Sequence, residues 1–224
     1  MRFPQNGDLD IKSAFFREVL QRNGTAVDAT IATLCCNGVI SSQSLGIGGG
    51  FLMTVYHRKS GKATSIIARE TAPAAATIDM FHGNAKLSSE GALAVAIPGE
   101  VRGWAKAKEL FGNPDVSWES LIRPTIKLCR EGIPVTFSKA IALSSNVEKI
   151  RKDPGLRRIY INPVTNTVWK EGDNYTRPDF ANTLERIATL GPQEFYEGKT
   201  AQGIVQDLQE RGGIITMEDM KNYK

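Results

Sequence analysis

The chain has 224 residues, of which 41% are hydrophobic and 23% charged, and its formal net charge is +4. These values are ordinary for a globular protein and allow one large domain or two small ones. The basic residues are scattered rather than gathered into a stripe with interleaved aromatic residues, which argues against a nucleic-acid partner. No run approaches the ~20 apolar residues of a membrane span.

Apolar spacing predicts helices along most of the chain. The first two are expected over residues 11–22 and roughly 26–37. The second follows a sequence that resembles a capping box, Thr25-Ala-Val-Asp28, and Gly38 suits the position just after its end.

A β-hairpin is predicted next. Residues 51–57 and 63–68 are apolar or β-branched at most positions, and the polar, glycine-containing loop 58–62 joins them. Because an isolated hairpin is marginal in water, we expect it to lie in a larger sheet. The chain supplies few other strands, so this pattern points to missing partners for the hairpin.

The remainder is expected to be mainly helical. A short helical turn is predicted at 77–81 and a short strand at 92–97. The further predicted helices cover residues 100–111, 118–130, 136–152, 178–190 and 200–210, and Thr216 caps a final short turn. Pro124 should kink its helix or delay its start. Residues 153–175 are rich in turn formers and are interpreted as an excursion with a short hairpin around 164–168.

The cysteines and histidines do not form a recognisable catalytic or metal-binding pattern. Cys35 and Cys36 are adjacent within a predicted helix, and Cys129 lies in another, so we interpret all three as core thiols. Their spacing is not that of metal ligands. His57 and His82 are each interpreted as surface or turn residues.

A glycine-rich turn precedes the first strand. Gly46 is followed by Ile47 and then by Gly48, Gly49 and Gly50. The turn lacks the Lys-Ser/Thr pair of a phosphate-binding loop, and a strand rather than a helix follows it. A close-packed turn is therefore the preferred interpretation, with direct ligand contact as the alternative.

Arg69 is the strongest candidate for a binding residue. It ends the return strand of the hairpin, and a planar guanidinium suits bidentate binding of a carboxylate. The alternative is a surface arginine, or one paired with a structural acid. Asn23 and Asn174 each begin an Asn-X-Thr sequon, which is a glycosylation acceptor if the protein enters the secretory pathway.

Five phrases carry a family resemblance. They are Asn-Gly-Thr-Ala-Val-Asp-Ala (23–29), Gln-Ser-Leu-Gly-Ile-Gly-Gly-Gly (43–50), Ala-Arg-Glu-Thr-Ala-Pro (68–73), Val-Ala-Ile-Pro-Gly-Glu-Val-Arg-Gly (95–103) and Gly-Gly-Ile-Ile-Thr-Met-Glu-Asp-Met-Lys-Asn-Tyr (212–223). In this order and spacing they resemble the large subunit of the γ-glutamyltranspeptidases, or glutathione hydrolases. The resemblance covers the chain from about residue 11 onwards.

The resemblance implies a fold and a reaction. The family fold is a four-layer αββα sandwich of the N-terminal-nucleophile hydrolase type, so residues 1–224 would form an incomplete large-subunit domain, α/β and helix-rich. One precursor cuts itself into two subunits, and the small subunit begins with the catalytic threonine. That threonine is expected beyond Lys224, so no catalytic residue is assigned within the chain, and neither a metal nor an organic cofactor is expected.

The resemblance also implies roles and partners. Arg69 matches the arginine that binds the α-carboxylate of the γ-glutamyl group, whereas Glu70 and Thr71 are interpreted as structural. The expected substrates are glutathione and other γ-glutamyl compounds, with transfer to water, amino acids or peptides, and the expected protein partner is the small subunit. The implied location is the plasma membrane or the extracellular space, although no anchor or signal peptide is visible in the chain. The alternative is a truncated, non-catalytic relative that acts as a γ-glutamyl-binding or interaction module.

Overall fold

The computed structural model describes the backbone from residue 7 and the side chains from residue 11 to residue 224. Most of the segment inspected for a signal peptide therefore lies outside the described residues. The contacts divide the chain into two units, Met1–Gly46 with Phe111–Glu185 (unit 1) and Ile47–Leu110 with Arg186–Lys224 (unit 2). No helix in the described part of the chain is long and apolar enough to cross a membrane.

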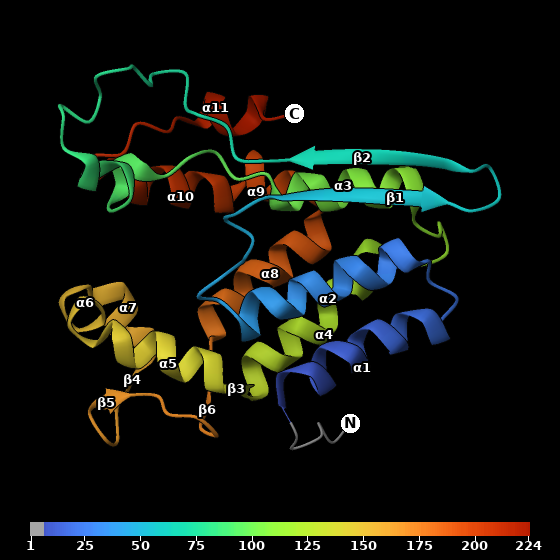
Figure 1. Ribbon diagram of the computed structural model, residues 1–224, viewed down its shortest axis with the longest axis horizontal. Helices are drawn as coiled ribbons and strands as arrows, with labels where there is room; N and C mark the ends of the chain where they lie inside the picture. Colours follow the sequence, from blue (N-terminus) through green and yellow to red (C-terminus); the bar gives the residue numbers. More distant parts are fainter. Residues whose placement is uncertain (1–6) are drawn as a thin grey trace. The chain divides into compact units, whose positions relative to one another are not determined.

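Unit 1 is mainly helical (Figure 1). Its helices are α1 (Gly7–Gln21), α2 (Ala26–Ile40), α4 (Trp118–Glu131), α5 (Phe137–Ser145), α6 (Val147–Lys152), α7 (Pro154–Tyr160) and the first part of α8 (Pro178–Leu190). Two short antiparallel pairs complete it, β3 (Ile133–Pro134) with β6 (Asn174–Tyr175) and β4 (Ile161–Asn162) with β5 (Thr167–Val168).

Helix α2 is the centre of unit 1 and packs against α1 and α4. The predicted capping box is present, because the Thr25 hydroxyl accepts from the Asp28 backbone N–H and the Asp28 side chain accepts from the Thr25 backbone N–H. At the other end, the buried Lys139 Nζ donates to the Val39 carbonyl at 2.8 Å and so satisfies a carbonyl of the last turn.

Two helix predictions in unit 1 were wrong in detail. Helix α2 continues to Ile40, and Gly38 lies inside it rather than after it. A Cβ on Gly38 would lie 3.1 Å from the Gly46 Cα, so this glycine permits a close return of the chain. The single helix predicted over 136–152 is broken at Asn146, whose side chain donates to the Ala142 carbonyl at 2.9 Å.

The segment interpreted as a turn-rich excursion is more ordered than predicted. Residues 154–160 form α7, because Asp153 caps its first turn and Pro154 occupies a first-turn position, where proline is tolerated. The hairpin expected around 164–168 exists, but its paired residues are 161–162 and 167–168. The pair β3–β6 was not predicted, since strands of two residues carry no periodic signal.

Unit 2 combines the hairpin with further helices (Figure 1). Its elements are β1 (Phe51–His57), β2 (Lys62–Ala68), the 3₁₀ turns η1 (Ala85–Ser88) and η2 (Ala92–Ala94), α3 (Glu100–Phe111), the last part of α8, α9 (Gln193–Tyr196), α10 (Lys199–Gln209) and α11 (Met217–Asn222). Helix α9 was not predicted, and the expected helical turn at 77–81 is a hydrogen-bonded turn without a helix.

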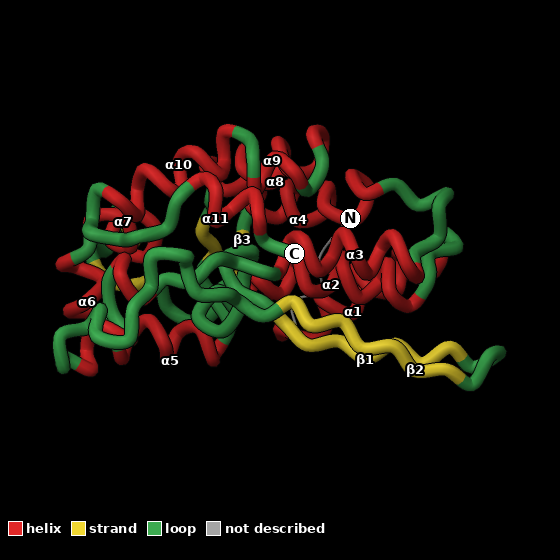
Figure 2. The backbone as a smooth tube through the Cα atoms, turned by 90° about the horizontal axis from the view of Figure 1, so that it is seen from above, coloured by secondary structure: helices red, strands yellow, loops and turns green. Residues whose placement is uncertain are grey.

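The predicted hairpin is confirmed. It pairs in register from Phe51 with Ala68 to His57 with Lys62. One face packs on α3, since a Cβ at Gly103 would overlap Ala68 and the Phe51 ring. Figure 2 shows the two strands as an extended ribbon beside α3. The strand predicted at 92–97 was wrong: residues 92–94 form η2, and Ile97 makes only an isolated antiparallel bridge with Thr71.

Candidate carboxylate-binding site at Arg69

Arg69 lies directly after β2, with its side chain on the surface. The side chain is 68% exposed, and its Nε lies 3.5 Å from the Glu70 Oε2. An ion pair of this length at the surface contributes little to stability. The guanidinium is therefore accessible to a ligand carboxylate.

The backbone around Arg69 is held much more firmly than its side chain. The Tyr223 hydroxyl donates to the Arg69 carbonyl at 2.7 Å. Two residues on, Thr71 and Ile97 exchange both backbone hydrogen bonds, at 3.2 and 2.8 Å. The Ala74 N–H then donates to the Asp219 carboxylate at 2.9 Å. The backbone after β2 is thus held at three positions, Arg69, Thr71 and Ala74.

Glycines make this close packing possible. A Cβ on either Gly50 or Gly99 would overlap the Ala68 carbonyl oxygen. The Gly49 carbonyl accepts hydrogen bonds from the Gly99 and Glu100 N–H groups, each at 2.9 Å. The interpretation of 46–50 as a close-packed turn is confirmed at Gly50, where the reason is proximity rather than a positive φ, but not at Gly48, where a Cβ would meet no atom within 4 Å.

An aromatic stack lies against this backbone. The Tyr196 and Tyr223 rings stack with centroids 5.8 Å apart and an angle of 14°. The Arg102 guanidinium lies over the Tyr196 ring, 4.4 Å from its centroid. The Tyr196 hydroxyl donates to the Pro98 carbonyl and accepts from the Arg102 backbone N–H, both at 3.0 Å. Sequence reasoning assigned no role to these three side chains, although Arg102 and Tyr223 fall within the resembling phrases.

Glu100, in the first turn of α3, is a buried acid in the same unit. Its side chain accepts from the Trp104 Nε1 at 3.1 Å, and the residue is only 3% exposed. Burial raises the pKa of Glu100 to about 7; the Trp104 hydrogen bond opposes this shift, and the negative charge of Glu70 adds to it.

The cysteine and histidine predictions are confirmed. All three cysteines are buried and free, and burial raises the pKa of Cys129 to about 11. Such a thiol holds little thiolate at neutral pH and is a poor nucleophile. His57 and His82 are both exposed. Among the described residues no cluster of potential ligands could hold a metal ion.

Both sequon asparagines belong to unit 1, whereas Arg69 belongs to unit 2. Asn23 and Asn174 are exposed. The first sequon's Thr25 hydroxyl is engaged in the capping box of α2. Both asparagines are accessible, which glycosylation requires.

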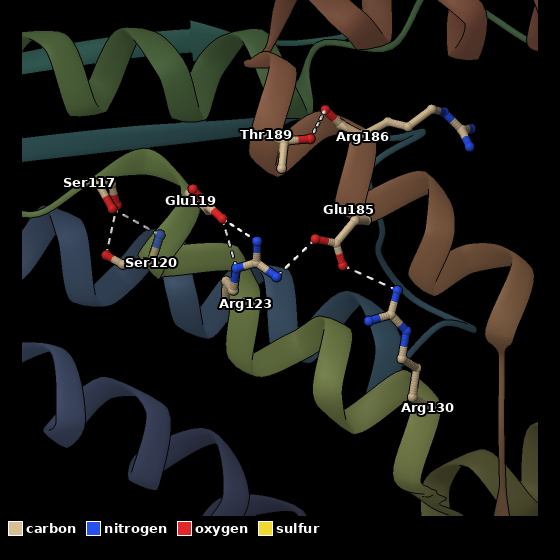
Figure 3. A network of polar contacts seen from close by, with 8 residues as sticks. All are labelled: Ser117, Glu119, Ser120, Arg123, Arg130, Glu185, Arg186 and Thr189. Atoms are coloured by element: carbon tan, nitrogen blue, oxygen red, sulfur yellow. Dashed lines mark hydrogen bonds and ion pairs between the residues drawn. The ribbon is translucent and has the colours of Figure 1, made fainter.

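Unit 1 also contains a cavity of about 450 Å³, lined by Phe15 and Glu18 of α1 and by residues of α4. Its cations already have carboxylate partners. Arg123 and Arg130 bind the two oxygens of Glu185 at 2.8 and 3.1 Å (Figure 3). Lys127 lies 3.8 Å from Glu131. Arg123 and Arg130 are thus held by Glu185, whereas the 51% exposed Lys127 has only a long ion pair, as Arg69 has with Glu70.

Comparisons with known proteins place these features in a family. The family model for Gamma-glutamyltranspeptidase matches residues 13–224, so the chain belongs to the γ-glutamyltranspeptidase family. Scoloptoxin SSD14 of Scolopendra dehaani is 48% identical over 93% of this chain and 36% of its own length. Glutathione hydrolase proenzyme 1 of Schizosaccharomyces pombe is 41% identical over 92% of this chain and 32% of its own length.

Solved structures agree with this assignment. The γ-glutamyltranspeptidase of Helicobacter pylori matches with a TM-score of 0.90 and 31% identity, over 100% of this chain and 65% of that chain. The predicted family and fold class, a helix-rich α/β part of an N-terminal-nucleophile hydrolase sandwich, are confirmed. The chain spans about a third of the length of the curated relatives named above.

Proposed function

We propose that residues 1–224 are an incomplete large-subunit domain of a γ-glutamyltransferase/glutathione hydrolase and that Arg69 binds the substrate α-carboxylate. The complete protein would cleave the γ-glutamyl amide of glutathione and transfer the γ-glutamyl group to water, amino acids or peptides. The observation that carries the proposal is the exposed Arg69 guanidinium on a firmly held backbone, inside a motif that matches the family.

The geometry suits this role for a physical reason. A carboxylate can accept two parallel hydrogen bonds from a guanidinium, and such charge-assisted pairs are the stronger class. The long contact with Glu70 is a weak competitor for a bidentate ligand.

The nucleophile is proposed to lie beyond Lys224, as a threonine that begins the small subunit. Supporting this, the described cysteines are buried and Cys129 has a raised pKa, so no activated thiol is available. Neither a metal nor an organic cofactor is part of the proposed reaction.

The small subunit is also the proposed occupant of the outer hairpin face. Leu52, Tyr56 and Ile67 are 68%, 64% and 73% exposed there. Within the described residues β1 and β2 pair only with each other, so each has an open edge. An apolar face with open edges favours addition of further strands. By family resemblance we also propose a plasma-membrane or extracellular location, where the exposed Asn23 and Asn174 could carry glycans.

The test is the Michaelis constant of the full-length protein for a γ-glutamyl anilide. Arg69→Ala should raise KM by about 10- to 150-fold, since a charge-assisted hydrogen bond contributes about 1.5–3 kcal/mol. Arg69→Lys should restore part of the loss, because an ammonium cannot make the bidentate contact.

Arg58→Ala is the matched control, since Arg58 is an exposed arginine of the same unit in the hairpin loop. It should leave KM unchanged. An unchanged KM for Arg69→Ala would refute the assignment. Glutathione binding without turnover by the full-length protein would favour the alternative, a non-catalytic γ-glutamyl-binding module.

A further inference from the structure

A tyrosine from the far end of the chain holds the backbone of the candidate binding arginine. The Tyr223 hydroxyl donates to the Arg69 carbonyl at 2.7 Å, although the two residues are 154 positions apart. Tyr223 follows α11, whose first turn is fixed by a capping box between Thr216 and Asp219. The contact therefore joins two separately ordered segments.

The space for this hydroxyl is built into the fold. A Cβ on Gly99 would overlap the Tyr223 hydroxyl oxygen, so only a glycine leaves room for it there. Burial and the charge of Glu70 raise the pKa of Tyr223, while Arg102 opposes the shift. The hydroxyl therefore keeps its proton at neutral pH and remains a donor.

The ring of Tyr223 is fixed as well. It stacks on Tyr196, which is itself anchored through its hydroxyl to the Pro98 carbonyl and the Arg102 N–H. The Arg102 guanidinium covers Tyr196 at 4.4 Å. Within the described residues, the buried Nε and Nη2 of Arg102 have no hydrogen-bond acceptor, so stacking is the contact that orients this group.

We propose that Tyr223 is a positioning residue for substrate recognition, which acts through Arg69 by fixing the carbonyl of that arginine. The inference rests on the proposed function of Arg69. The Arg69 side chain is mostly exposed, so the position of its guanidinium depends on the position of its backbone rather than on side-chain packing. A bidentate contact tolerates little displacement, and loss of a hydrogen bond to the supporting backbone should loosen it.

The test is Tyr223→Phe in the full-length protein, which removes the hydroxyl and keeps the stacking ring. KM for a γ-glutamyl anilide should rise about three- to tenfold, the size expected for one neutral hydrogen bond, while kcat stays nearly constant. Carboxylate binding is the same in the ground and transition states, which is why KM alone should respond. If the full-length protein binds without turnover, the dissociation constant for glutathione should change by the same factor.

Tyr160→Phe is the matched control. The Tyr160 hydroxyl makes a 2.8 Å hydrogen bond to Ser42 in unit 1, so its removal costs a similar contact without touching Arg69. It should leave KM unchanged. An equal rise in KM for both variants would show a general structural effect and overturn the proposal.

A double-mutant cycle tests whether Tyr223 acts on substrate binding through Arg69 or independently of it. If Tyr223 acts through Arg69, Tyr223→Phe should have no further effect on KM in the Arg69→Ala background. A full additive effect there would overturn the positioning role. Sensitivity to Arg69→Ala with none to Tyr223→Phe would refute this inference alone, whereas insensitivity to Arg69→Ala would refute the proposed function itself.

Discussion

At the scale of single residues, Arg69 combines an exposed guanidinium with a firmly held backbone. The Tyr223 hydroxyl binds its carbonyl, and the next segment pairs with Ile97. Flexible surface arginines lose rotamer freedom when they bind, which weakens their contacts. Because the Arg69 backbone is held in place, the guanidinium can occupy fewer positions before it binds a ligand.

The glycine turn gives a paired prediction. Gly50→Ala should lower the free energy of unfolding by more than ~1 kcal/mol, because the new Cβ would overlap the Ala68 carbonyl. Gly48 has no neighbouring atom within 4 Å of such a Cβ, so Gly48→Ala should be neutral or slightly stabilising. Chemical denaturation of both variants measures the difference. Equal stabilities would show that the turn is merely flexible.

Glu100 predicts a pH dependence of stability. Its pKa is raised from 4.5 to about 7 in the folded state. Between these values the unfolded chain has lost the proton that the folded protein keeps, so rising pH favours unfolding. The contribution of Glu100 is fully present below about pH 4.5 and is lost as pH rises through about 7.

Glu100→Gln should therefore gain in stability relative to the native chain when pH rises from 4.5 to 7.5. The control is Glu109→Gln, since Glu109 is an exposed acid of the same helix that pairs with Lys106. Denaturation midpoints at both pH values give the result. A constant difference between Glu100→Gln and the native chain would contradict the buried-acid account.

At the scale of elements, the sequence predicted those with strong local signals. The hairpin 51–68, the capping box at Thr25 and the start of α3 at Glu100 follow from alternation, caps and the Pro98-Gly99 break. Helix α7 had such signals in Asp153 and Pro154, but the surrounding turn formers obscured them. Elements of two to four residues, such as β3 and α9, depend on tertiary contacts and are not encoded locally.

The hairpin yields a prediction about association. Its exposed Leu52 and Ile67 lie opposite each other on the outer face, beside open strand edges. The isolated 224-residue chain should therefore self-associate, and Leu52→Thr with Ile67→Thr should reduce this. Val164→Thr, at an exposed apolar position of unit 1, is the control. Size-exclusion chromatography measures the association. A monomer for the native sequence would contradict the proposal that the outer hairpin face binds another chain.

At the scale of the whole molecule, the resembling phrases identified the family and led to the proposal for Arg69, but they gave no indication that Tyr223 holds the Arg69 backbone. The contact between Tyr223 and Arg69 spans 154 positions. No periodicity or spacing in the sequence could pair these residues, because the contact depends on how α11 and the hairpin pack. The stack of Arg102 on Tyr196 is equally a product of tertiary structure.

Arg69 is proposed to recognise the α-carboxylate of a γ-glutamyl substrate. The most direct measurement compares kcat/KM of the full-length protein for a γ-glutamyl anilide and for the same compound with its α-carboxylate converted to a carboxamide. The native protein should prefer the carboxylate by about 10- to 150-fold, and Arg69→Ala should lose most of that preference. An undiminished preference in Arg69→Ala would contradict the claim.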